Sequence, residues 1–174
     1  MYDVKRTITG VEPITLTEMK QFLLNRYDPD VTADALLTSM ITAARELAEQ
    51  YANRSFIAQT IEYTEYMKLK WSEETPEIKL PFPNHLTITE VKIADTITTD
   101  YELIGINTFT IQFNGRNYTT NSDGTKFYVK YTAGECNARQ KNAIMQICKD
   151  MYENRGATQM SSNGFIILNV DKVY

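Results

Sequence analysis

Cysteine and histidine, the residue types most often used in metal centres and nucleophilic catalysis, are scarce in this sequence. The chain has two cysteines, Cys136 and Cys148, and a single histidine, His85. A structural zinc site needs about four closely spaced ligands, and a nucleophile needs a basic partner beside it. Cys148 falls on the apolar face of a predicted helix, so we expect a buried thiol rather than a redox pair. We expect His85 to be an ordinary loop residue.

Three aspartates, Asp28, Asp30 and Asp34, have the alternating spacing of cation ligands. A calcium loop also needs a central glycine and a closing glutamate, and this segment has neither. The Asn121–Gly124 turn has the same deficiency, so turn and capping roles are expected for these residues. The sequence also contains no phosphate-binding loop, dinucleotide fingerprint or nucleophile elbow. We therefore expect no enzymatic activity, no metal ion and no cofactor.

Length and composition predict a folded chain of one domain, or one domain with a large insertion. The chain has 174 residues, of which 43% are hydrophobic and 23% charged, and its net charge is −4. An acidic balance argues against a non-specific nucleic-acid binder, which needs a basic surface. No apolar stretch has the length of a signal-peptide core or a membrane span. We expect a protein of the reducing cytoplasm that does not bind membranes.

The clearest predicted element is a helix over residues 32–52, which Thr32 could cap. Its apolar residues recur at helical spacing and form one continuous stripe: Leu36, Leu37, Met40, Ile41, Ala44, Leu47, Ala48 and Tyr51. The intervening polar positions predict a solvated face: Thr38, Thr42, Arg45, Glu46, Glu49 and Gln50.

Two further helices flank the chain's central part. A capping box formed by Thr15 and Glu18 begins a short amphipathic helix over residues 15–26. Asn137 is a suitable N-cap for a helix over residues 137–155, and Gly156 supplies its stop. Because both helices carry apolar stripes, we expect them to pack together with the helix over 32–52.

Between the second and third helices the apolar period changes from 3.6 to 2, which predicts strands. Tight turns such as Asn114-Gly115 indicate antiparallel pairing. The first thirteen residues are expected to be an extended lead-in. The predicted strands span 57–67, 77–80, 87–94, 101–104, 108–113 and 126–132.

The predicted fold class is therefore α+β, with a helical bundle from the N- and C-terminal helices. An antiparallel β subdomain, either a small sandwich or a barrel, is inserted at about residues 57–133. Residues 1–156 form a single domain, and residues 157–174 form a C-terminal tail.

The tail begins polar and then becomes apolar without alternation, which predicts a strand buried on both faces. Burial would contribute about 1.5–3 kcal/mol for each large side chain, and ordering costs about 1–2 kcal/mol for each residue. Because the sums nearly cancel, added backbone hydrogen bonds would decide where the tail docks, either on another protein's sheet or on its own. The candidate contact residues of the tail are Phe165, Ile166, Ile167, Leu168 and Val170; Trp71 and Phe82 are candidates elsewhere.

An ordered series of short segments in this chain resembles the head–tail connector (adaptor) family of tailed double-stranded DNA phages. The resemblance covers about residues 11–156. The segments that carry it are Glu12–Lys20, Asp34–Leu37, Ala43–Glu46, Tyr51–Arg54, Ile78–Pro81, Tyr131–Gly134 and Tyr152–Arg155.

This resemblance implies a non-enzymatic virion protein, assembled in the host cytoplasm and located in the neck at the head–tail interface. It implies a ring, expected to be a dodecamer, beneath the portal protein and above a downstream neck, stopper or tail protein. DNA would pass through the ring without specific binding, and the C-terminal segment would engage the portal. Two alternatives stay open: another neck ring protein, such as a stopper or tail terminator, and a monomeric protein-binding module.

Overall fold

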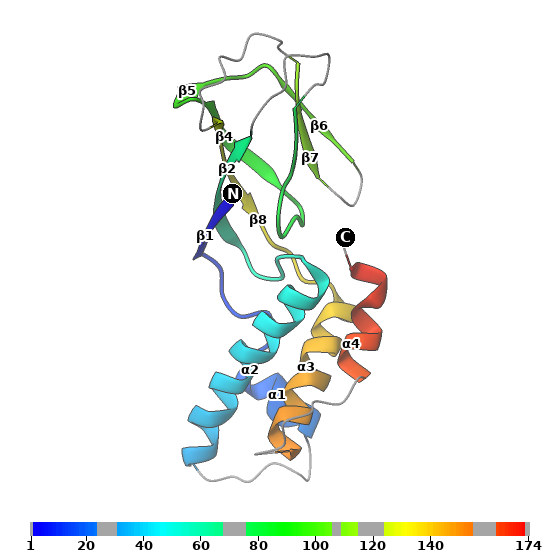
Figure 1. The fold of residues 1–174 in the computed structure, drawn as a ribbon. Helices are drawn as coiled ribbons and strands as arrows, with labels where there is room; N and C mark the ends of the chain where they lie inside the picture. Colours follow the sequence, from blue (N-terminus) through cyan, green and yellow to red (C-terminus); the bar gives the residue numbers. More distant parts are fainter. Residues whose placement is uncertain are drawn as a thin grey trace. The chain divides into compact units, whose positions relative to one another are not determined.

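The computed structural model of the chain describes residues 2–23, 31–67, 76–105, 109–114, 124–154 and 163–172 (Figure 1). It contains helices and antiparallel sheets, which confirms the α+β class. Two compact units are present. The β unit comprises Met1–Thr9 and Ala58–Gly134, and the helical unit comprises Gly10–Ile57 and Glu135–Tyr174.

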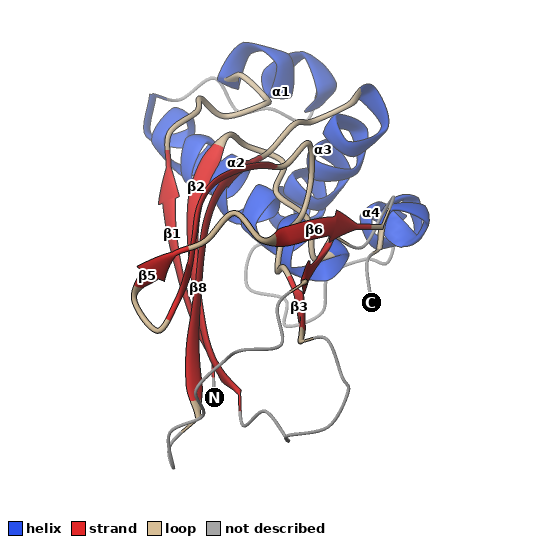
Figure 2. Ribbon diagram, turned by 90° about the horizontal axis from the view of Figure 1, so that it is seen from above, coloured by secondary structure: helices blue, strands red, loops and turns tan. Residues whose placement is uncertain are grey.

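The β unit contains two antiparallel sheets (Figure 2). The five-stranded sheet has the order β1-β2-β8-β4-β5, and the three-stranded sheet has the order β3-β7-β6. The strands of the first sheet are β1 (Tyr2–Ile8), β2 (Gln59–Met67), β8 (Thr125–Ala133), β4 (Thr87–Ile93) and β5 (Thr96–Ile97). Those of the second are β3 (Glu77–Lys79), β7 (Thr110–Phe113) and β6 (Tyr101–Ile104).

Because side chains alternate between the two faces of a strand, one face of each sheet contributes its side chains to a shared hydrophobic core. In β8, Phe127, Val129 and Tyr131 are fully buried, as predicted. In β7, Ile111 and Phe113 are fully buried, also as predicted. The rings of Phe113 and Phe127 lie 5.0 Å apart between centroids. The two sheets therefore contribute to one core.

The six predicted strands are present with slightly different bounds, and two strands were missed. Residues 2–8 are not only an extended lead-in but form β1, which pairs along its whole length with β2. Its apolar alternation is interrupted by Arg6, which lies in the core-facing row and obscured the pattern. β5 has only two residues, too few for any periodicity. The second residue of the predicted Asn114-Gly115 turn lies outside the described residues.

The helical unit contains α1 (Leu16–Leu23), α2 (Val31–Ala52), α3 (Ala138–Glu153), α4 (Asn163–Leu168) and the 3₁₀ turn η2 (Asn169–Asp171). The predicted capping box at Thr15 and the predicted N-cap at Asn137 are both present. The Glu18 carboxylate accepts from the Thr15 N–H over 2.7 Å, and the Thr15 hydroxyl accepts from the Glu18 N–H over 3.1 Å. Asn137 and Gln140 form the equivalent pair at α3. Residues 24–26 and Gly156, the predicted helix ends, lie outside the described residues.

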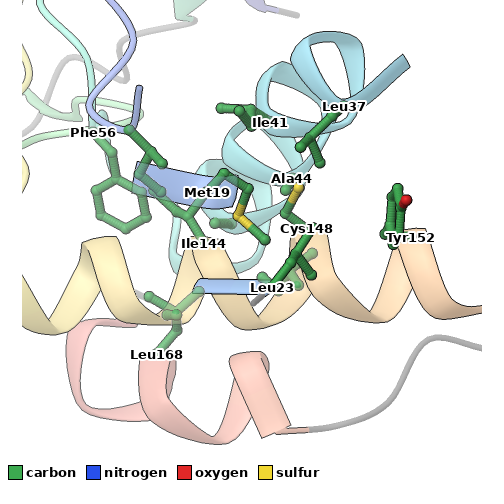
Figure 3. Packing of buried hydrophobic residues seen from close by; sticks show 14 of the residues in the cluster. Met19, Leu23, Leu37, Ile41, Ala44, Phe56, Ile144, Cys148, Tyr152 and Leu168 are labelled. Atoms are coloured by element: carbon green, nitrogen blue, oxygen red, sulfur yellow. The ribbon is translucent and has the colours of Figure 1, made fainter. Parts of the chain in front are cut away.

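The helices share a second hydrophobic core (Figure 3). Leu37, Ile41 and Ala44 of α2 are buried, as the stripe predicted, whereas Leu36 is exposed. α2 begins at Val31, so Thr32 lies inside the first turn rather than at the cap.

The solvated face predicted for α2 is wrong at two positions. Arg45 and Glu49 are each 0% exposed. Charged side chains are rarely buried unless they are paired, so a periodicity argument assigns them to solvent. Here the two residues pair with each other, and segments outside the helix supply further partners.

The C-terminal run Phe165–Val170 is helical, not a strand as predicted. It belongs to the helical unit and packs there rather than on a sheet of its own chain. A short apolar run cannot distinguish a strand from a buried helix by periodicity alone.

Candidate functional site

α4 divides the predicted tail contacts into a buried set and an exposed set. Leu168 is fully buried, and Figure 3 shows it lying against α3. Phe165 and Ile167 are half-buried and pack against the same helical core. Ile166 and Val170 are 59% and 76% exposed. Ile166 lies in α4 and Val170 in the adjacent 3₁₀ turn η2.

Gly164 allows α4 to approach α3 closely. A Cβ atom at this position would lie 2.4 Å from Cγ1 of Ile147 and 2.9 Å from the carbonyl oxygen of Ala143. Both distances are shorter than a van der Waals contact, so only glycine fits without movement of α3. The glycine therefore fixes where α4 begins on the α3 surface.

Polar contacts hold the other end of the segment. The Tyr51 hydroxyl donates to Oδ1 of Asn169 over 2.5 Å, and its ring packs on Phe165 at 4.7 Å between centroids. Arg54 Nε donates to the Asp171 carbonyl oxygen over 2.6 Å. Arg139 Nη2 donates to Oδ1 of the same aspartate over 2.6 Å. Contacts from α2, from the residues after it and from α3 therefore fix η2, and no sequence pattern indicates them.

A buried charged cluster ties together three segments of the helical unit. Arg45 Nε donates to Oε2 of Glu12 over 2.9 Å, and Arg45 Nη1 donates to Oε2 of Glu49 over 2.9 Å. The other Glu49 oxygen accepts from the Phe56 N–H over 2.7 Å and from the Ile57 N–H over 3.3 Å. The cluster thus fastens the residues before α1 and after α2 to α2 itself.

The electrostatic environment keeps Arg45 charged. Burial alone would lower the pKa of its guanidinium, but the hydrogen bond to Glu12 and the charges of Glu49, Glu12 and Glu46 raise it above its usual value. The spacing of Arg45 and Glu49, i to i+4, is the one sequence feature that could have indicated this pair. The geometry supports a structural role, because Arg45 and Glu49 are fully buried and bond to each other and to neighbouring segments of the helical unit.

The other predicted contact and site residues are dispersed. Trp71 lies outside the described residues. Phe82 has a positive φ of 50°, is half-buried and lies beneath the Arg6 guanidinium, 4.3 Å from the ring centroid. His85 is an exposed loop residue, as predicted. Asp34 lies within the first turn of α2 and pairs with Lys20, whose Nζ is 2.7 Å from its carboxylate oxygen.

The residues described contain no group of three or more histidine, cysteine, aspartate or glutamate side chains arranged to hold a metal ion. Among the same residues, no helix combines the length and the apolarity that crossing a bilayer requires.

The two thiols have little nucleophilic character. Cys148 is fully buried, as predicted, and burial raises its pKa to about 12. Burial also raises the pKa of the half-buried Cys136 to about 11, with smaller opposing effects of Lys141 and reinforcing effects of Glu49 and Asp171.

We expect both cysteines to resist alkylation at neutral pH in the folded protein. Since the thiolate reacts, a pKa raised from 9 to about 11 lowers the rate at Cys136 roughly a hundredfold. The rate should rise as the pH approaches 11. Iodoacetamide labelling between pH 7 and pH 11, followed by mass spectrometry, measures the labelling rate and its rise with pH. Denatured protein is the reference. Rapid labelling of the folded protein at pH 7 would contradict the predicted resistance of the two cysteines.

Compared by sequence, the chain matches no protein-family model and no curated protein. Its fold, in contrast, is similar to solved structures of gene transfer agent (GTA) particles. A chain from the neck of an empty GTA particle, computed with C6 symmetry, aligns with a TM-score of 0.72 and 18% identity. The alignment covers 98% of this chain and 96% of that chain.

Two further structures give the same result. A chain from the virion of a native GTA particle aligns with a TM-score of 0.69 and 16% identity, over 97% of this chain and 95% of that one. A chain from the neck of a native GTA particle, computed with C12 symmetry, aligns with a TM-score of 0.68 and 16% identity, over 98% and 96%. The protein therefore has, over nearly its whole length, the fold of a subunit found in GTA necks.

Proposed function

We propose that the protein is a structural virion protein of a phage neck, and within the neck a head–tail connector (adaptor) subunit. It would form a ring beneath the portal and join the DNA-filled capsid to the next neck or tail component. The observation that carries this proposal is the shared fold with GTA neck chains, which covers 98% of this chain at a TM-score of 0.72. The ordered connector-like segments of the sequence support it independently.

The proposal includes a non-enzymatic role, a location in the virion neck and assembly from the host cytoplasm. It also includes the predicted architecture, in which a β subdomain at about residues 57–133 is inserted in a helical bundle. The partners are the portal, neighbouring copies in a dodecameric ring, and a downstream stopper or tail protein. The net charge of −4, multiplied around a ring, suits a channel that DNA must traverse without being held.

Purified portal rings provide the direct test. Mixed with this chain, they should acquire an added ring that is visible by electron microscopy and larger in sedimentation. A chain that remains unbound and monomeric beside intact portals would contradict the connector role and favour the binding-module alternative. A ring that forms only beneath an already assembled connector would indicate a stopper or terminator instead.

The exposed residues Ile166 of α4 and Val170 of η2 are the part of the tail that a portal can reach while the segment stays docked. We expect Ile166→Asp or Val170→Asp to weaken portal binding by about 2 kcal/mol or more, roughly thirtyfold, because a charge enters an apolar contact. Both residues are exposed, so the melting temperature should hardly change.

Glu153→Asp, on the exposed end of α3, keeps the charge and serves as the control for the binding assay. Portal binding that survives both aspartate substitutions would exclude these two exposed residues as the anchor.

A further inference from the structure

Among the residues described, each sheet of the β unit has an outer strand of four or more residues with one unpaired edge. β1 is an outer strand of the five-stranded sheet, and β6 is an outer strand of the three-stranded sheet. Figures 1 and 2 place the two strands on different sides of the β unit. The remaining edge strands, β5 and β3, have only two and three residues. An open edge carries unpaired backbone groups that can bind another strand.

The hydrogen bonds that continue the ladders show which backbone groups face outward. The Thr9 N–H donates to the Ala58 carbonyl over 2.9 Å, which continues the β1–β2 register. Backbone groups in an antiparallel ladder alternate in direction. The N–H and C=O groups of Val4 and Ile8 therefore point away from β2, toward the outer edge of the sheet.

The same reasoning applies to β6. The Phe113 N–H donates toward β3, to the Pro76 carbonyl over 3.1 Å, and the Asn114 N–H donates to the Asp100 carbonyl over 3.2 Å. Residues Gln112 and Thr110 of β7 consequently face Glu102 and Ile104 of β6. The backbone groups of Tyr101 and Leu103 are left pointing to the open edge.

Both edges expose apolar side chains of their core-facing rows. On β1, Tyr2 and Ile8 lie in the same row as the half-buried Val4, yet they are 70% and 49% exposed. On β6, Leu103 lies in the row opposite the buried Ile111, yet it is 42% exposed. A strand added at either edge would cover these side chains.

The outer faces of the two edges offer one pair of opposite charges, Lys5 on β1 and Glu102 on β6, although β1 also carries Asp3 on that face. Lys5 of β1 has a side chain that is 69% exposed and 3.9 Å from Glu62, the limit of an ion pair. Glu102 of β6 is exposed and makes no ion pair with the residues described. Antiparallel pairing of the outward groups allows only a few registers. One of them sets Val4 opposite Leu103, Arg6 opposite Tyr101 and Lys5 opposite Glu102, whereas a shift of two residues sets Asp3 or Thr7 against Glu102.

We propose that the β1 edge of one copy pairs antiparallel with the β6 edge of the next copy, with Lys5 opposite Glu102. Because the two edges differ, this contact is heterologous and propagates from copy to copy until the ring closes. The occupant of each edge is thus a second copy of this chain. The inference rests on the proposed ring, for which it names the subunit contact.

A disulfide between positions 5 and 102 tests this register. Non-hydrogen-bonded antiparallel pairs have Cα atoms about 4.5 Å apart, within disulfide range. We expect Lys5→Cys/Glu102→Cys, assembled on portal rings and oxidised, to convert most of the chain into reducible covalent multimers with a mapped 5–102 link. The control, Asp3→Cys/Glu102→Cys, has equally exposed positions in the disfavoured register and should give almost none.

Charge reversal provides a second measurement. Lys5→Glu and Glu102→Lys should each reduce ring assembly, and the double variant should restore it. Lys79→Glu, the same change on the β3 edge, should leave assembly unaltered.

The failure of the edge contact can be distinguished from the failure of the proposed function. Rings that form on the portal without a 5–102 link, or that tolerate both single reversals, would overturn the edge contact and leave the connector role intact. If no ring forms on the portal, the connector role fails, and oxidation of the free double-cysteine chain decides the edge contact alone.

Discussion

Replacing Glu49 with alanine is expected to lower the free energy of unfolding by about 3–5 kcal/mol. The substitution leaves the buried Arg45 without its fully buried partner and leaves the Phe56 N–H, buried and bonded to Glu49 at 2.7 Å, without its acceptor. Arg45 then keeps only the partly exposed Glu12 and Glu46. A buried charge that loses part of its hydrogen bonding is costly because no water replaces the lost partner. Urea denaturation monitored by circular dichroism measures the loss.

The matched control is Glu46→Ala on the same helix. Glu46 also approaches Arg45, at 3.5 Å, but its side chain is 51% exposed. Exposed ion pairs contribute about 0–1 kcal/mol, so this variant should be nearly as stable as the native chain. Equal effects of the two substitutions would mean that the Arg45–Glu49 pair is accessible to water in solution.

Leu168→Ala is the second substitution with a large expected effect, at about 2–5 kcal/mol. Leu168 is fully buried, so its truncation leaves a cavity between α4 and the rest of the helical core. The loss of stability cannot exceed the free energy with which α4 docks on the helical core. If the cavity costs more than that, α4 detaches instead. Urea denaturation gives the stability, and amide hydrogen exchange over residues 163–172 detects detachment.

Val170→Ala is the control, because Val170 lies in the adjacent η2 and is 76% exposed. It should change stability by less than about 0.5 kcal/mol. Rapid exchange over residues 163–172 in the native chain, before any substitution, would contradict the docked position of α4.

Local chemistry made much of this fold predictable. The helix starts at Thr15 and Asn137 follow from capping, since their partners Glu18 and Gln140 are three residues away. The buried rows of side chains in β7 and β8 follow from the alternation of apolar and polar residues, which indicates burial on one face of a strand. Such patterns depend only on neighbouring residues, so a sequence displays them directly.

What the sequence could not show depends on contacts between distant segments. Glu49 is buried because Phe56 and Ile57 fold back over α2 and donate to it. β1 is a strand because it pairs with β2, and this partner lies more than fifty residues further along the chain. The tail is helical because Gly164 can approach α3 and Tyr51 and Arg139 hold its end. Periodicity contains no information about any of these partners.

Loss of the gene from its source phage tests the neck role most directly, with electron microscopy of the lysate as the measurement. If the protein is a connector subunit, we expect filled or leaking heads beside complete, unattached tails. Restoring the gene should restore joined particles. Normal infectious particles, or a lysate without heads, would contradict the connector role.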